Sequence, residues 1–172
     1  MINKKWHLIL IAFNCFCCLI AYASDATAVK TKESLQINIP VKIKKGNAVF
    51  NIDHVALLEN KSIALGHINI LSNDFKAQNV KGEIIAIFHT EAGYMSLDDK
   101  AYNEFQHVNT GNPYKELIAN LMNRGVQFEL CGATAKANQW ANADLISGLK
   151  VNTDAMIRLT QLGQDGFVIL NE

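Results

Sequence analysis

Two residues of this 172-residue chain, His89 and Cys131, follow apolar segments and could carry chemistry. His89 follows the apolar run at residues 84–88, and Cys131 follows residues 126–130. A helix is expected shortly after Cys131, so its sulfur would face amide donors and the positive end of a helix dipole. This setting favours the thiolate, which is the reactive form of cysteine. A protonated His89 nearby would act in the same direction. The pattern predicts a cysteine-based site with Cys131 as the reacting group and His89 in support.

A structural interpretation competes with this hypothesis. A free cysteine is among the most buried residue types and often serves as a small core side chain. A histidine at the end of a strand is commonly held only by hydrogen bonds. The functional hypothesis therefore requires the sulfur of Cys131 to be reachable from solvent. A sulfur sealed in the interior would leave only the structural interpretation.

Motifs of other site classes are missing from the chain beyond residue 23. Cys131 is the only cysteine there, which excludes a dithiol cycle within one chain. Neither a Gly-x-Gly-x-x-Gly dinucleotide motif nor a Gly-x-Ser-x-Gly nucleophile elbow occurs. The spacing of His54, His67, His89 and His107 does not match a metal site. We therefore expect no cofactor and no metal ion.

The elements that must position these residues alternate between strand and helix. Apolar runs predict strands at residues 48–52, 83–88, 126–130, 149–151 and 167–170. Helical spacing and capping residues predict helices at residues 62–75, 98–108 and 112–125, at 134–140 including Trp140, and at 154–162. This alternation is typical of an α/β fold with a parallel sheet and helices on both faces.

Ligands of open parallel sheets bind beyond the carboxyl ends of the strands. A loop at residues 89–93 and the turn after Cys131 are both expected at this edge. The candidate substrate-binding residues in these two segments are Thr90, Glu91, Gly93, Gly132 and Thr134.

Residues 1–23 have the three zones of a secretory signal peptide. Two lysines precede an apolar run at residues 6–20, and a small-x-small site ends at Ala23. The apolar run is short for a membrane span. We expect cleavage after Ala23, a periplasmic or secreted protein, and no membrane association after cleavage.

The charge of the expected mature chain excludes a large basic surface. The full chain has 16 basic and 16 acidic residues, and removal of Lys4 and Lys5 makes the remainder slightly acidic. Nucleic acid is therefore not an expected partner.

Residues 24–46 are expected to form a linker followed by an edge strand or arm, ahead of the main domain at residues 47–172. Apolar side chains alternate with polar ones from Leu35 to Ile43, which is a one-sided strand pattern. Pro40 on the polar side favours an edge strand or arm over a central strand.

The cysteine segment resembles a known family. Residues 125–134, Gly-Val-Gln-Phe-Glu-Leu-Cys-Gly-Ala-Thr, are similar to the strand-plus-cysteine segment of DsrE/DsrF-like proteins. Residues 112–121 ahead of it and residues 145–170 after it fit the same pattern, so the resemblance extends from Ala48 to the C-terminus. Exported members with signal peptides belong to this group.

The resemblance implies a three-layer α/β/α sandwich with a mainly parallel five-stranded sheet, assembled into trimers or hexamers. It also implies sulfur relay, in which a cysteine at this position holds sulfane sulfur as a persulfide and exchanges it with a donor or acceptor protein. By position that role falls on Cys131. His89 matches a histidine commonly found after the preceding strand, whereas Thr90 replaces a glycine often found there.

Three functions remain open from the sequence, and catalysis is not decided among them. The first is sulfur handling on Cys131. The second is a non-catalytic oligomeric module of the periplasm that binds a small ligand at the crevice or a protein through the arm. The third is a redox partner that forms intermolecular disulfides.

Overall fold

The structure is a computed structural model that describes residues 34–172. The predicted signal peptide and cleavage site lie outside these residues. The chain divides into two units at residues 1–39 and 40–172. Over residues 34–172, no helix combines the length and apolar character that a membrane crossing would need.

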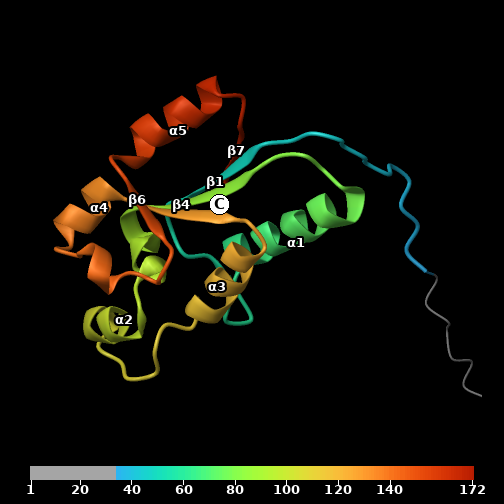
Figure 1. The fold of residues 1–172 in the computed structure, drawn as a ribbon. Helices are drawn as coiled ribbons and strands as arrows, with labels where there is room; N and C mark the ends of the chain where they lie inside the picture. Colours follow the sequence, from blue (N-terminus) through green and yellow to red (C-terminus); the bar gives the residue numbers. More distant parts are fainter. Residues whose placement is uncertain (1–33) are drawn as a thin grey trace, which may run out of the picture. The chain divides into compact units, whose positions relative to one another are not determined.

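A five-stranded parallel sheet forms the centre of the second unit (Figure 1). Its strands are β1 (Ala48–Ile52), β4 (Ile84–Phe88), β5 (Gln127–Cys131), β6 (Lys150–Asn152) and β7 (Val168–Asn171). They lie in the order β6-β5-β4-β1-β7, and every neighbouring pair is parallel. A small antiparallel pair, β2 (Leu57–Leu58) and β3 (Lys61–Ser62), follows β1. The predicted mainly parallel five-stranded sheet is confirmed.

Helices cover both faces of this sheet, which confirms the α/β/α layering. The helical segments are α1 (Ile63–Gln78), the 3-10 helix η1 (Thr90–Ser96), α2 (Asp99–Gln106), α3 (Lys115–Asn123), α4 (Gly132–Ala137), the 3-10 helix η2 (Asn142–Asp144) and α5 (Ala155–Gln164). Figure 1 shows α1 and α3 on one side of the sheet and α5 on the other.

The two faces of the sheet carry cores of different size. The larger core contains Phe50, Phe88 and Phe128 with side chains of α1, α3, η1 and α2. The smaller core is formed by four sheet residues and one helix; its buried members are Val49, Ile85, Ile87, Cys131, Ala155, Leu159 and Leu162. Among residues 34–172, α5 is the one helix that contributes to this smaller core, so it covers the sheet residues there, Cys131 included.

Three predicted helix starts are confirmed by their caps. The side chains of Ser62, Asp98 and Asp154 each accept hydrogen bonds from backbone N–H groups in the first turn of the helix that follows. Such caps satisfy N–H groups that have no partner within the helix.

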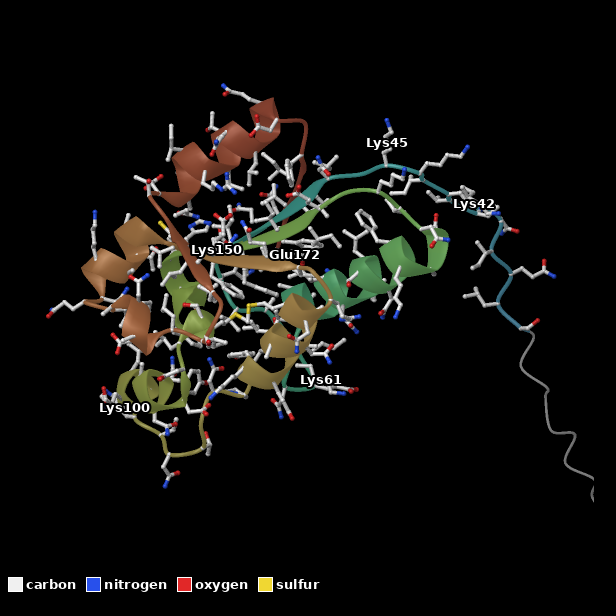
Figure 2. All side chains as sticks on the ribbon, in the orientation of Figure 1. Lys42, Lys45, Lys61, Lys100, Lys150 and Glu172 are labelled. Atoms are coloured by element: carbon white, nitrogen blue, oxygen red, sulfur yellow. The ribbon has the colours of Figure 1, made fainter. Side chains whose placement is uncertain are left out.

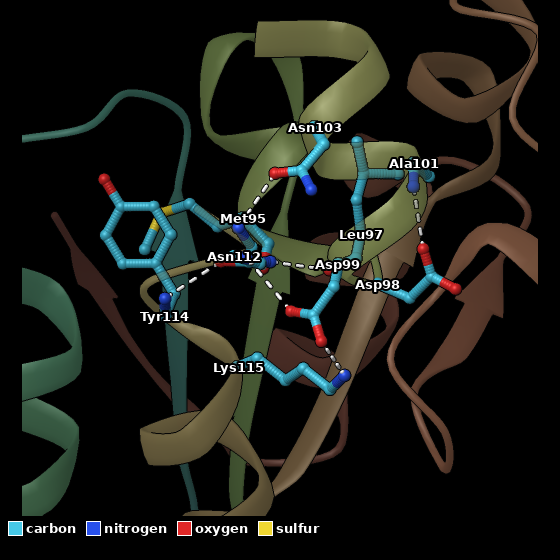
Figure 3. Close-up of polar contacts among 10 residues, drawn as sticks. Met95, Leu97, Asp98, Asp99, Ala101, Asn103, Asn112, Tyr114 and Lys115 are labelled. Carbon is cyan, nitrogen blue, oxygen red and sulfur yellow. Dashed lines mark hydrogen bonds and ion pairs between the residues drawn. The ribbon is translucent and has the colours of Figure 1, made fainter. Parts of the chain in front are cut away.

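The predicted helix start at Asn112 and Pro113 is displaced, because Asn112 has a different role (Figure 3). Its buried side-chain amide donates to the carbonyl oxygens of Met95, at 3.0 Å, and Leu97. Its side-chain oxygen accepts from the N–H of Tyr114 at 2.9 Å, and α3 begins only at Lys115. Asn112 therefore ties the start of α3 to the end of η1.

Four further boundaries differ from the sequence prediction. Residues 35–43, expected to form an edge strand or an arm, form no strand within the single chain. The predicted loop at residues 89–93 instead begins the helix η1, whose end is fixed by a hydrogen bond from Leu97 N to Tyr94 O. Helix α2 ends before Val108, and α4 begins already at Gly132 and ends before Trp140.

Candidate functional site

The carboxyl ends of β4 and β5 lie side by side, as the sequence predicted. Phe88 pairs in register with Leu130, and His89 and Cys131 follow these partners directly. Each of the two side chains has another partner, however. The imidazole of His89 contacts Asn51, and the sulfur of Cys131 contacts the backbone of Ala155.

The thiol of Cys131 is buried against α5. The residue is 4% exposed and belongs to the smaller core with Ile87 and Leu159. Its Sγ accepts a hydrogen bond from the N–H of Ala155, the first residue of α5, at 3.3 Å. The amide donor thus comes from the start of α5 and not, as expected, from the helix that follows Cys131, and the expected presentation of the sulfur to solvent is absent.

His89 is buried and is held by a chain of side-chain amides. Asn51 Nδ2 donates to Asn171 Oδ1 at 3.0 Å, which leaves Asn51 Oδ1 to accept from His89 Nε2 at 2.8 Å. Burial lowers the pKa of His89, and the carboxylates of Asp53 and Asp154 only partly oppose this effect. His89 is therefore neutral at neutral pH, so it does not supply the positive charge that the sequence hypothesis placed beside the thiol.

The backbone at Thr90 has a conformation that favours glycine. Its φ is +46°, in the left-handed region that a β-branched residue rarely adopts. The N–H of Thr90 donates to Thr134 Oγ1 at 3.0 Å, and its hydroxyl donates to the carbonyl oxygen of Asp53. These contacts join the segments that follow β1, β4 and β5.

Gly93, Gly132 and Thr134, three of the candidate substrate-binding residues, are buried packing elements. A Cβ on Gly132 would lie 2.5 Å from the carbonyl oxygen of Asn152, and a Cβ on Gly93 would lie 2.7 Å from Thr134 Cγ2. The two glycines thus permit close approach between segments.

The other two candidates, Thr90 and Glu91, line a cavity of about 460 Å³. Its remaining lining residues are Tyr94, Phe105, Gln106, Asn138 and Trp140. The rings of Phe105 and Trp140 meet nearly at right angles with centroids 5.1 Å apart. Cys131 does not line this cavity, nor the groove of about 530 Å³ between β6 and α5. The sequence analysis did not place Phe105 and Trp140 at a site, because both lie within predicted helices, at residues 98–108 and 134–140.

A buried ion pair next to Cys131 was also missed. Glu129 lies two residues before Cys131 on the same face of β5, is 2% exposed, and binds Arg158 of α5 at 2.8 Å. Burial raises the pKa of Glu129, but hydrogen bonds from Arg158, Asn152 and Gln127 outweigh it, so the pKa is lowered overall. The sequence signal was a glutamate at an inward position of an otherwise apolar strand.

Among residues 34–172, no group of three or more His, Cys, Asp or Glu side chains is arranged to hold a metal ion.

Comparison with known proteins gives a family and a fold. The model of the DsrE/DsrF-like family matches residues 44–171. A protein of unknown function from Methanobacterium thermoautotrophicum, MTH1491, has a similar structure, with a TM-score of 0.58 and 18% identity over 74% of this chain and 99% of that one. The ychN protein from E. coli is also similar, with a TM-score of 0.53 and 13% identity over 73% of this chain and 99% of that one. No curated protein matches the chain.

Proposed function

Because this chain belongs to the DsrE/DsrF-like family, we propose that it handles sulfane sulfur, carried as a persulfide on Cys131. The observation that carries this proposal is the hydrogen bond from Ala155 N to Cys131 Sγ at the start of α5. A backbone N–H at a helix N-terminus stabilises negative charge on sulfur, whether on a thiolate or on a persulfide.

The proposed step is a thiol exchange without net oxidation. The thiolate of Cys131 attacks the outer sulfur of a donor persulfide. A new sulfur–sulfur bond forms on Cys131, the donor's sulfur–sulfur bond breaks, and the donor leaves as a thiolate. An acceptor thiolate then removes the outer sulfur by the same chemistry and restores the Cys131 thiolate.

In the structure the sulfur of Cys131 is sealed from solvent, which by itself favours the structural interpretation, so this step requires a motion that uncovers it. The first turn of α5 must move aside before a donor can reach the sulfur. Two features of that turn support such a motion: Met156 and Ile157 are exposed, and only Ala155 anchors the turn in the smaller core. The proposal also includes export, with cleavage after Ala23 and action outside the cytoplasm.

A persulfide-transfer assay tests this function. The purified mature protein is incubated with glutathione persulfide and digested, and the peptide containing Cys131 is weighed. We expect a mass gain of one sulfur atom that dithiothreitol removes, and no gain in Cys131→Ser. Absence of the adduct in the native protein, with an adduct on the unfolded chain, would reject the function. N-terminal sequencing of protein recovered from the periplasm or medium tests the cleavage after Ala23.

A second candidate function, non-catalytic binding of a small ligand, is favoured by the cavity beside Thr90 and Glu91. This cavity is accessible, whereas the sulfur is not. Trp140 lies in its lining and reports on binding through its fluorescence. If this candidate is correct, ligand titration changes the Trp140 emission equally in the native protein and in Cys131→Ser.

A further inference from the structure

We propose that residues 35–43 of one copy of this chain add as an extra strand to the free edge of β7 in a second copy. This interaction is separate from the sulfur chemistry. It rests on an open sheet edge, a segment of the same chain that fits it, and the direction in which that segment enters the sheet.

The strand β7 leaves one edge of its backbone without a strand partner in the described sheet, where it is the last strand beyond β1. The N–H groups of Val168 and Glu172 donate to Asn47 and Asn51 on the β1 side, at 2.9 and 3.0 Å. Since alternate residues of a strand turn their backbone groups to opposite sides, Ile169 points its N–H and C=O outward.

This edge has few of the features that usually block strand addition. β7 has no charged residue and no proline along Val168–Asn171, and Val168 and Ile169 are 61% and 41% exposed. The opposite edge strand, β6, is shorter and carries Lys150. Edge strands are usually protected by charge, proline, short length or a covering segment. Since β7 lacks charge and proline, we expect its free edge to be protected by a segment that covers it.

The segment at residues 35–43 has the pattern that an added strand requires. Its apolar side chains occur at every second position and are all exposed: Leu35, Ile37, Ile39, Val41 and Ile43. Most are β-branched, which suits extended backbone. Alternating pockets for such side chains, together with backbone hydrogen bonds, are the basis of binding by strand addition.

Charge complementarity also supports this pairing. Residues 34–45 contain Lys42, Lys44 and Lys45 and no acidic residue, and Figure 2 shows Lys42 and Lys45 on the extended segment ahead of β1. Residues 164–172, which include β7, contain Asp165 and Glu172 and no basic residue. Opposite net charges on the two segments favour their encounter.

The way in which residues 44–46 join β1 favours pairing with β7 of a second copy over pairing with β7 of the same chain. Lys81 N donates to Lys44 O at 3.0 Å, and Gly46 N donates to Lys81 O at 3.1 Å. Lys81 precedes β4, so these bonds continue the β1–β4 ladder and residues 44–46 run in line with β1. The chain would have to reverse direction ahead of β1 to lie along its own β7.

Measurement of molar mass tests the proposal. In the full mature chain, Ile37→Asp combined with Ile39→Asp places two charges on the apolar side of the segment. The matched control, Gln36→Asp with Asn38→Asp, places the same charges on its polar side. By sedimentation we expect the native chain and the control to self-associate and the Ile variant to bind at least about tenfold more weakly. A monomeric native chain, or equal association of both variants, overturns the proposal.

Cross-linking between separate chains identifies the contact itself. One chain carries Asn38→Cys, the other carries Val168→Cys, and both carry Cys131→Ser. After mixing and treatment with a short bismaleimide, we expect a dimer that contains one of each chain. A third variant carries both cysteines on one chain; cross-linking within that chain alone, or no cross-linking between separate chains, overturns the exchange between copies.

Discussion

Cys131 Sγ lies 3.3 Å from the backbone nitrogen of Ala155, so the start of α5 both polarises the thiol and covers it. The helix terminus that donates a hydrogen bond to the sulfur also blocks attack on it. Reactivity at this cysteine is therefore tied to the mobility of α5, and variants that loosen or displace that helix are informative.

Removal of the Glu129–Arg158 ion pair should loosen α5. Arg158→Met keeps the apolar stem but leaves the buried carboxylate of Glu129 without its charged partner. We expect a loss of about 3 kcal/mol in the free energy of unfolding, measured by urea denaturation. The rate of Cys131 alkylation by iodoacetamide should rise by a larger factor than the fraction of unfolded protein does.

The exposed ion pair between Lys100 and Glu104 supplies the control for that variant. Lys100→Met should change the free energy of unfolding by no more than about 0.5 kcal/mol. Alkylation that is unchanged in Arg158→Met would show that this ion pair does not hold the cover over Cys131.

A side chain at Gly132 should displace the turn between β6 and α5. The Cβ of Gly132→Ala would lie 2.5 Å from the carbonyl oxygen of Asn152, which is backbone and cannot rotate away. We expect destabilisation of about 1–3 kcal/mol, measured by thermal unfolding. In contrast, Gly66→Ala within α1 meets no atom within 4 Å and should stabilise by about 1 kcal/mol. Equal effects at the two sites would contradict this packing role.

Replacement of Thr90 should separate backbone strain from hydrogen bonding. Thr90→Val keeps the β-branched shape at φ +46° and loses the hydroxyl that donates to Asp53 O, whereas Thr90→Gly loses the hydroxyl but removes the strain. We expect Thr90→Gly to be more stable than Thr90→Val by about 1–2 kcal/mol in urea denaturation. The reverse order would show that the left-handed backbone at Thr90 is not costly.

Acidification should destabilise the protein through His89. Its pKa is lowered in the folded state, so between that lowered pKa and the ordinary value of about 6.5 the unfolded chain binds more protons. The free energy of unfolding then falls as the pH falls below about 6.5. His89→Gln retains an amide donor for Asn51 but cannot titrate, so its stability should depend less on pH in this range. If the free energy of unfolding changes equally with pH in the native protein and in His89→Gln, then His89 does not cause the pH dependence.

The strand–helix order was predictable because its signals are local. Alternation, continuous apolar runs and capping side chains such as Ser62 and Asp154 act within a few residues. Displaced boundaries occur where a distant contact decides the conformation. Asn112 is drawn to the carbonyl groups of Met95 and Leu97, which are far from it in sequence, and α3 consequently begins later than predicted.

The candidate site was predictable in location but not in exposure. Register placed His89 and Cys131 on adjacent strand ends because parallel strands finish at one edge of a sheet. Whether α5 lies over the sulfur depends on residues far apart in sequence, such as Leu159 and Ile87 in the smaller core or Arg158 and Glu129 in their ion pair. No local pattern around Cys131 contains that information.

The crossover from β6 to β7 gives α5 a mechanical role. This helix of ten residues begins at the thiol beside one border of the sheet and delivers the chain to the strand at the opposite border. One end of the helix thus contacts the sulfur of Cys131, and the other end leads to β7. If β7 is held in an assembly, the C-terminal end of α5 is restrained. The movement that uncovers Cys131 would then be confined to the first turn of the helix.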